Sequence, residues 1–342
     1  MPTETCPRAS VVVPAYNAAG TLPACLAALS QQTLFPPDFE IIVADDGSTD
    51  DTTRVATEAG AGQVLTLPHR GPAAARNAGI AVAHGDIILF TDADCRPAPE
   101  WLAQMLRPLD DPGVSGVKGS YRTDQSEVVA RLAQCEFEER YNRQERLPSI
   151  DFVDSYAAAF RSAVLREVGG FNPAFPRADN EDVDLSYRLA EHGCRLVFNR
   201  QAVVYHRHVA TWNRYARLKA RRGYWRMAVY RLHPGKALHD SYTPQILKLQ
   251  VLLVYLSLGL AFLTPFWTPL LWGSLSSLAA LLLSAWPFTK LVARLDRPVA
   301  PWAPWFVVVR ACAFAAGVAA GTGATLLGRP ALRPGDARPE DG

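Results

Sequence analysis

The sequence predicts an α/β protein with a mostly parallel sheet, followed by C-terminal transmembrane helices. Up to about Asp240, short apolar strands alternate with helical segments, which is the pattern of βαβ units. The strands are apolar along their whole length rather than at alternate residues, as expected when both faces of a parallel sheet are covered. Beyond that point, apolar runs of near-spanning length predict membrane helices.

Four apolar strands are expected near the N-terminus, at 10–16, 40–44, 64–67 and 87–91. Thr21 can cap a first helix, since apolar residues follow it at helical spacing. Ser48 or Thr49 can cap a second helix after the second strand. A third helix, rich in small residues, covers 71–84 and stops at Gly85.

The middle of the chain continues this alternation. Further strands are expected at 113–119, 195–199 and 202–205, and helices at 99–106, 126–146, 162–168 and 182–192. The segment 211–232 mixes Trp, Tyr and Leu with many Arg. It is expected to be a helix that lies in the membrane interface or, alternatively, packs on the globular domain as a basic surface helix.

Three apolar stretches of near-spanning length, with Trp near several ends, lie at 246–263, 266–288 and 302–327. Only Thr264 and Pro265 separate the first two, so one of them can be re-entrant or interfacial instead. The loop before the third stretch contains Lys290, Arg294 and Arg297. The positive-inside rule therefore places that loop in the cytoplasm.

The predicted organisation is a globular domain, a basic-aromatic linker helix, a transmembrane region and a disordered tail, at 1–210, 211–240, 241–330 and 331–342. Arg310, inside the third apolar stretch, either snorkels to the inner interface or lines a functional pocket.

The distribution of charge and of cysteine indicates what the protein contacts and in which compartment it lies. The net charge of +2 hides a local asymmetry, because 206–236 contains nine Lys or Arg and no acidic residue. Its aromatic residues and its place beside the apolar region predict contact with anionic membrane lipids rather than nucleic acid. The six cysteines form no C-x-x-C pair, so their spacing predicts neither a zinc site nor a disulfide framework. No basic-then-apolar leader precedes the first strand, so the globular domain is expected in the cytoplasm, at the inner membrane.

Asp92 and Asp94 directly follow the strand at 87–91. The crevice of a parallel sheet lies outside the carboxyl ends of its strands. Two carboxylates there can hold a hard divalent cation through oxygen ligands and leave room for a phosphate-bearing substrate.

Asp92 and Asp94 belong to a series of five polar motifs, Pro-Ala-Tyr-Asn at 14–17, Asp-Asp-Gly-Ser at 45–48, Gly-Pro-Ala-Ala-Ala-Arg-Asn-Ala-Gly at 71–79, Thr-Asp-Ala-Asp at 91–94 and Glu-Asp-Val-Asp-Leu at 181–185. Over residues 10–206 this ordered series resembles the family 2 glycosyltransferases with the GT-A nucleotide-sugar-binding fold. The resemblance implies a metal-dependent, inverting transfer of a sugar from a nucleotide-diphosphate sugar.

The resemblance assigns nucleotide-sugar binding to residues of the second and third motifs. Asp46, beside Asp45, would accept a charge-assisted hydrogen bond from the N–H of a uracil-like base. Alternatively, both acids only shape a turn and cap a helix. Arg76 and Asn77 would face the nucleotide, where Arg76 counters phosphate charge or bonds to the base edge.

The first motif would form the loop against the nucleoside, through Pro14, Ala15, Tyr16 and Asn17. Within it, Tyr16 packs on the base or ribose, or else is an ordinary core tyrosine. The resemblance also places the helix and glycine turn at 160–172 on the acceptor side.

The resemblance further implies Mg²⁺ or Mn²⁺ as the cofactor. Asp94 would coordinate the ion directly, and Asp92 would help through the ribose or the ion. His206 would complete the metal shell, with His208 as a competitor for that role.

Asp182, with Glu181 as second choice, would be the base that takes the proton of the acceptor hydroxyl. The alternative is that the acidic residues at 181–184 merely favour the start of a helix.

The predicted function is the transfer of a single sugar, and four other functions are weighed against it. Processive polysaccharide synthases of this family carry a Q-x-x-R-W motif, and the nearest match, at 221–226, lacks the glutamine. A catalytically inactive nucleotide-sugar-binding membrane scaffold is disfavoured by the joint presence of Asp92, Asp94 and Asp182. A dehydrogenase or P-loop NTPase is excluded because neither glycine-rich motif is present. The membrane region makes a lipid-linked or cell-envelope glycan the expected acceptor.

Overall fold

The computed structural model describes residues 7–34, 38–175, 179–237 and 241–328. These residues form two compact units. The first contains 7–124 and 143–207, and the second contains 125–142 and 208–328. The predicted tail at 331–342 lies outside the described residues.

The described part of the first unit contains one sheet of eight strands. They are β1 (Ala9–Ala15), β2 (Phe39–Asp45), β3 (Gln63–Thr66), β4 (Ile87–Phe90), β5 (Arg96–Pro97), β6 (Gly116–Arg122), β7 (Ala158–Arg161) and β8 (Leu196–Tyr205). Their order across the sheet is β3-β2-β1-β4-β7-β6-β8-β5. The first four strands are parallel, and β6 also pairs with β8 in parallel. The prediction of a mostly parallel sheet is therefore confirmed.

The antiparallel strands escape prediction because they are short. β7 pairs antiparallel with both β4 and β6, and its four residues precede a helix without a strand-like pattern of their own. β5 has two residues and pairs antiparallel with the end of β8. The two strands expected at 195–199 and 202–205 are a single strand, β8.

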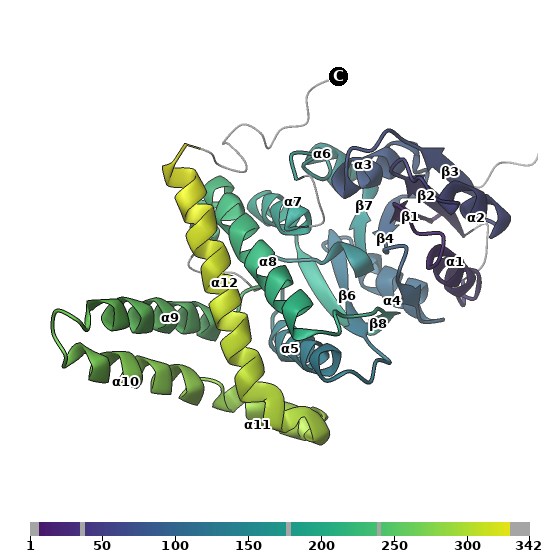
Figure 1. Ribbon diagram of the computed structural model, residues 1–342. Helices are drawn as coiled ribbons and strands as arrows, with labels where there is room; N and C mark the ends of the chain where they lie inside the picture. The colour runs from purple at the N-terminus through teal and green to yellow at the C-terminus, as the bar shows by residue number, and fades with distance from the viewer. Residues whose placement is uncertain (1–6, 35–37, 176–178, 238–240, 329–342) are drawn as a thin grey trace, which may run out of the picture. The chain divides into compact units, whose positions relative to one another are not determined.

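Helices cover the sheet (Figure 1), and their bounds are α1 (Leu22–Ser30), α2 (Thr52–Glu58), α3 (Pro72–Val82), α4 (Trp101–Leu106), α6 (Ser162–Glu167) and α7 (Glu181–Glu191). Two 3-10 turns, η1 (Arg107–Asp110) and η2 (Ser155–Ala157), complete the unit. One face of the sheet packs against α3, α6 and α7, which contribute Ile80, Leu165 and Leu189 to a core that also contains Phe90. Gly79 allows α3 to approach β1 closely, because a Cβ at this position would lie 2.4 Å from a methyl group of Val12. The close approach holds α3 against β1.

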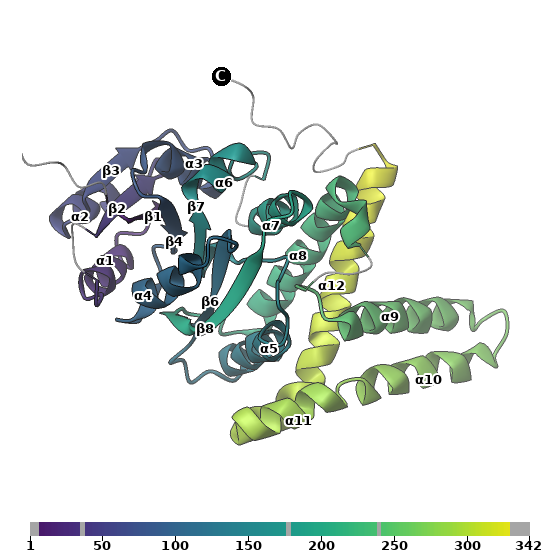
Figure 2. The same ribbon diagram turned by 180° about the vertical axis from the view of Figure 1, so that it is seen from behind.

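The second unit is helical (Figures 1 and 2). Its elements are α5 (Val128–Gln144), α8 (Trp212–Leu232), η3 (Pro234–Lys236), α9 (Gln245–Leu263), α10 (Leu270–Leu283), α11 (Trp286–Leu295), η4 (Arg297–Trp302) and α12 (Ala303–Leu326). Within the described residues, three segments are long and apolar enough to cross a membrane, namely Gln245–Leu263, Leu270–Leu295 and Arg297–Leu326. The second predicted stretch differs in detail, because its helix breaks between α10 and α11.

The predicted boundary of the globular domain at residue 210 needs a correction at α5. Residues 125–142 belong to the helical unit, although the sequence places them inside the 1–210 segment. Val129 and Leu132 of α5 pack in a core with Phe288 and Phe306. Arg131 of α5 also donates to a carboxylate oxygen of Asp296 at 2.7 Å.

α8 is a helix, as predicted, and it runs along α12. At Gly317 of α12, a Cβ would lie 1.9 Å from the carbonyl oxygen of Ala220, so only glycine permits this approach. Placement of α8 in the membrane interface stays a prediction.

Arg310 does not snorkel. It is buried inside the helical unit, where it donates to Gln250 at 3.2 Å and lies 3.7 Å from Glu136. Glu136 also pairs with Lys219 at 2.8 Å, so the buried charge has partners of opposite sign.

Candidate active site

A pocket of about 750 Å³ opens at the carboxyl ends of β1, β2 and β4. Its lining includes twelve residues of the predicted motifs, Pro14, Ala15, Tyr16, Asn17, Asp46, Gly71, Pro72, Ala75, Arg76, Asp92, Ala93 and Asp94. Parallel strands present their carboxyl ends at one edge, which explains why residues so far apart in sequence meet there. Asp45, Asn77, Glu181, Asp182 and His206 lie outside this lining.

Asp45 and Asp46 have different surroundings. The Asp45 carboxylate is fully buried and accepts hydrogen bonds from Ser48 and Thr53. It holds the turn before α2 and lies outside the pocket lining, and its predicted contact with the nucleotide sugar stays a prediction. Asp46 does line the pocket, although its two carboxylate oxygens each accept a backbone N–H, from Arg70 and Gly71, at 2.8 Å. Asp46 thus positions the backbone that leads into α3, and its side chain also contributes to the lining of the pocket.

Tyr16 stands at the rim of the pocket rather than in the core, with 47% of its surface exposed. Its ring stacks on His69, with ring centroids 4.2 Å apart. Asn17 has a positive φ of 48° and accepts a hydrogen bond from the backbone N–H of Thr49 at 2.8 Å. This bond ties the loop after β1 to the loop after β2, and the two together form one wall of the pocket.

Arg76 is buried and joins two carboxylates. It donates to Glu181 at 2.8 Å and to Asp92 at 3.0 Å. Burial disfavours its charge, but Asp92 and Glu181 outweigh that cost and hold the pKa of Arg76 above its usual value. Two protein side chains, Asp92 and Glu181, already share this guanidinium, so less of its charge is available to a phosphate. Arg76 still contributes to the lining of the pocket.

Glu181 and Asp182 begin α7. Burial, and then the adjacent Asp182, raise the pKa of Glu181 to about 8, against the opposing pull of Arg76. Asp182 is partly exposed and accepts the backbone N–H of Val183 at 2.8 Å. Of the two candidate bases, Asp182 has the more open carboxylate.

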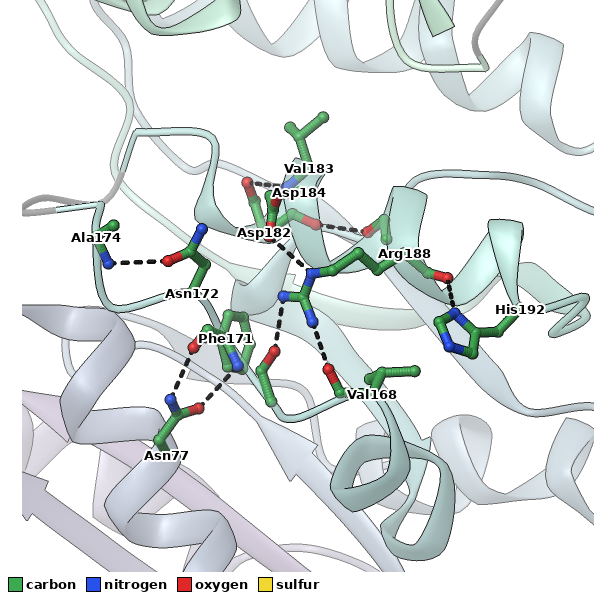
Figure 3. A network of polar contacts seen from close by, with 12 residues as sticks. Asn77, Val168, Phe171, Asn172, Ala174, Asp182, Val183, Asp184, Arg188 and His192 are labelled. Carbon is green, nitrogen blue, oxygen red and sulfur yellow. Dashed lines mark hydrogen bonds and ion pairs between the residues drawn. The ribbon is translucent and has the colours of Figure 1, made fainter. Parts of the chain in front are cut away.

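Asn77 does not face the pocket. Its amide donates to the carbonyl of Phe171 at 2.7 Å and accepts the backbone N–H of the same residue at 2.8 Å (Figure 3). The nitrogen and the oxygen of the side chain each have a backbone partner away from the pocket lining, and the predicted contact with the nucleotide stays a prediction. Arg188 of α7 holds the same turn by donating to the carbonyls of Val168 and Gly170, each at 2.7 Å.

Asp94 and His206 are the residues best placed to hold a divalent cation. Asp94 Oδ1 lies 3.5 Å from His206 Nδ1, and the Asp94 side chain is half exposed. Burial opposes the charge of Asp94, but the hydrogen bond with His206 holds its pKa below the usual value. Asp92 is engaged by Arg76 and is a poorer ligand. His208 belongs to the helical unit, where it contacts Gln134 at 2.9 Å, so it does not compete with His206.

Residues 10–169 match the family model described as Glycosyl transferase family 2. An uncharacterised glycosyltransferase of Mycobacterium bovis is 31% identical over 191 residues, which cover 55% of this chain and 81% of the relative. The chain belongs to glycosyltransferase family 2.

Two further comparisons show a second related glycosyltransferase and the fold of the chain. The pre-mycofactocin glycosyltransferase of Mycobacterium tuberculosis is 34% identical over 211 residues, which cover 58% of this chain but only 42% of the relative. The fold resembles the mannosyltransferase PcManGT from Pyrobaculum calidifontis, solved in complex with GDP-Man and Mn²⁺. That structure has a TM-score of 0.61 and 22% identity, and the match covers 93% of this chain and 88% of the other. The GT-A fold predicted from the motif series is therefore correct.

Two residues of this glycosyltransferase site were missed by sequence reasoning. His69 stacks on Tyr16 but lies two positions before the recognised Gly71 motif. Cys95 follows Asp94 directly, and only the fold shows that its sulfur faces His206. No local pattern marks either residue, because each partner comes from a distant segment.

Proposed function

We propose that this enzyme transfers one sugar from a nucleotide-diphosphate sugar to a membrane-associated acceptor, with inversion at the anomeric carbon. The observation that supports it best is the juxtaposition of the pocket, the Asp94–His206 pair and the start of α7. Arg76 links the donor side to the base side, since it contacts both Asp92 and Glu181.

In the proposed reaction the base of the donor lies against Tyr16 and Asp46. Asp46 has limited room for further hydrogen bonds, which favours a base that offers a single imide N–H, as uracil and thymine do, and a UDP-sugar is the proposed donor. A divalent cation fits the oxygen and nitrogen donors of Asp94 and His206, and Mn²⁺ in PcManGT supports this choice. The ion, Mg²⁺ or Mn²⁺, would supply charge stabilisation for the leaving diphosphate.

Asp182 would accept the proton of the acceptor hydroxyl. The hydroxyl oxygen forms a bond to the anomeric carbon as the bond from that carbon to the diphosphate oxygen breaks. Attack opposite to the leaving group inverts the configuration, and the proton stays on the Asp182 carboxyl until solvent removes it.

The proposed place of action is the cytoplasmic face of the inner membrane. The three apolar segments would anchor the chain, and the basic run at 206–236 would contact anionic lipids. A lipid-linked or cell-envelope glycan is then the acceptor within reach.

The test is hydrolysis or transfer from a panel of nucleotide sugars by detergent-purified enzyme with Mn²⁺, Mg²⁺ or EDTA. We expect metal-dependent turnover of one donor, lost by at least about a hundredfold in Asp94→Ala and Asp182→Asn. Donor binding without turnover, even with membrane lipid extract present, would instead identify a scaffold. Products with many added sugars would identify a processive synthase.

A further inference from the structure

Three metal-ligating atoms from distant parts of the chain converge beside the pocket. Asp94 Oδ1, Cys95 Sγ and His206 Nδ1 form a triangle with sides of 3.5, 3.7 and 3.8 Å. The three distances join the same three atoms pairwise, so one ion can contact all three atoms at once.

The sheet fixes this convergence. β5 pairs with β8 so that Arg96 lies opposite Tyr205 in an antiparallel register. The next step of that register places Cys95 opposite His206. The backbone N–H of His206 donates to the carbonyl of Arg122 at 2.9 Å, and its ring stacks on Tyr121, which orients the imidazole.

The size of the triangle suits a tetrahedral ion. Bonds of about 2.3 Å to sulfur and about 2.0–2.2 Å to nitrogen and oxygen give ligand–ligand edges of about 3.3–3.6 Å in a tetrahedron. The observed sides exceed these edges by a few tenths of an ångström at most. The triangle therefore matches one face of a zinc-type site, in which three protein ligands leave a fourth position for a water or substrate oxygen.

We infer that Asp94, Cys95 and His206 form a binding site for a thiophilic divalent cation such as Zn²⁺. A thiolate ligand favours Zn²⁺ over the oxygen-preferring Mg²⁺ and Mn²⁺. Because Asp94 and His206 also serve the cation of the proposed transfer reaction, the two kinds of ion compete, and Zn²⁺ excludes the activating ion. Binding displaces the thiol proton of Cys95 to solvent. The site itself is argued from the triangle of ligand atoms alone, whereas the competition with the activating ion rests on the proposed function.

Cobalt is the probe for this site. Co²⁺ takes the same tetrahedral ligands as Zn²⁺, and a bound thiolate adds a sulfur-to-metal charge-transfer band in the near ultraviolet. We expect full-length, metal-free enzyme in detergent to show this band with one Co²⁺ per chain, and Zn²⁺ to remove it. The measurement needs neither a sugar donor nor turnover, so its failure is distinct from failure of the proposed function.

Two cysteine variants decide the result. Cys95→Ser should lose the charge-transfer band and at least about tenfold in Zn²⁺ affinity, while Mn²⁺ affinity changes by less than about twofold. Cys25→Ser is the matched control, because Cys25 is also buried and its sulfur lies 3.6 Å from the carbonyl of Asp92, outside the triangle. It should keep the band. A wild-type enzyme without the band, or a Cys95→Ser enzyme that retains it, overturns the inference. Unchanged Mn²⁺ affinity in Cys95→Ser shows that the variant site is folded.

Discussion

Arg76 connects two carboxylates that belong to different motifs, so one side chain influences both sides of the pocket. In Arg76→Lys a single ammonium cannot reach both Asp92 and Glu181 in the same geometry, so one of these two side chains loses its charged hydrogen-bond donor. The loss of one charge-assisted hydrogen bond, about 1.5–3 kcal/mol, should lower kcat by about tenfold to a hundredfold. Steady-state kinetics of Arg76→Lys and wild type would measure this decrease in kcat. Arg54→Lys is the control, since Arg54 makes only exposed ion pairs, and an equal loss in that variant would contradict the prediction.

Glu181 should make stability depend on pH. Its pKa is about 8 in the folded protein, above its ordinary value of 4.5, mainly because of burial. The folded state therefore holds a proton that the unfolded state releases between these two values, and the contribution of Glu181 to stability is lost as pH rises through that window. The melting temperature of Glu181→Gln, relative to wild type, should rise between about pH 5 and pH 8. A difference that stays constant with pH would count against this assignment.

At the residue scale, the sequence located the motifs but not the use of each polar atom. Asp46 and Asp45 are adjacent in the sequence, yet only Asp46 lines the pocket. Asn77 follows Arg76 directly, yet its side-chain amide forms hydrogen bonds with the backbone of Phe171. Such choices depend on hydrogen-bond partners from other segments, which a motif does not contain.

At the scale of elements, the long apolar strands and the helices between them could be predicted, because their periodicity is local. β5 and β7 could not, since each is defined by its pairing and not by its own sequence. The short β5 nevertheless has a large effect, because its register with β8 carries Cys95 to His206.

The contact between α8 and α12 gives a test at the same scale. Gly317→Ala should destabilise the protein by about 1–3 kcal/mol, because its Cβ would overlap the carbonyl of Ala220. Gly323→Ala, on the same helix, places its Cβ where no atom lies within 4 Å. That variant should be neutral or slightly stabilising, since alanine favours helix more than glycine. Thermal unfolding in detergent compares the two, and equal melting temperatures would show that the helices do not pack this closely.

For the whole molecule, membrane topology can be tested from the predicted orientation. Thr268 lies between α9 and α10, and Arg297 begins the segment that leads to α12. In Thr268→Cys, a membrane-impermeant maleimide should label intact cells, whereas Arg297→Cys should react only from the cytoplasmic side. The parent chain provides the background, since Cys312 is exposed. Protection of Thr268→Cys from both sides would indicate a re-entrant hairpin instead of two spans.

The place of α5 has a practical consequence for anyone who wishes to produce a soluble fragment. The obvious cut, after the last strand, would keep α5 but remove Phe288 and Phe306, which cover its apolar face, and Lys219, which neutralises Glu136. The fragment would expose a hydrophobic strip and leave Glu136 without Lys219 and Arg310. Expression trials should therefore start from the full chain in detergent, or replace the apolar residues of α5 together with Glu136.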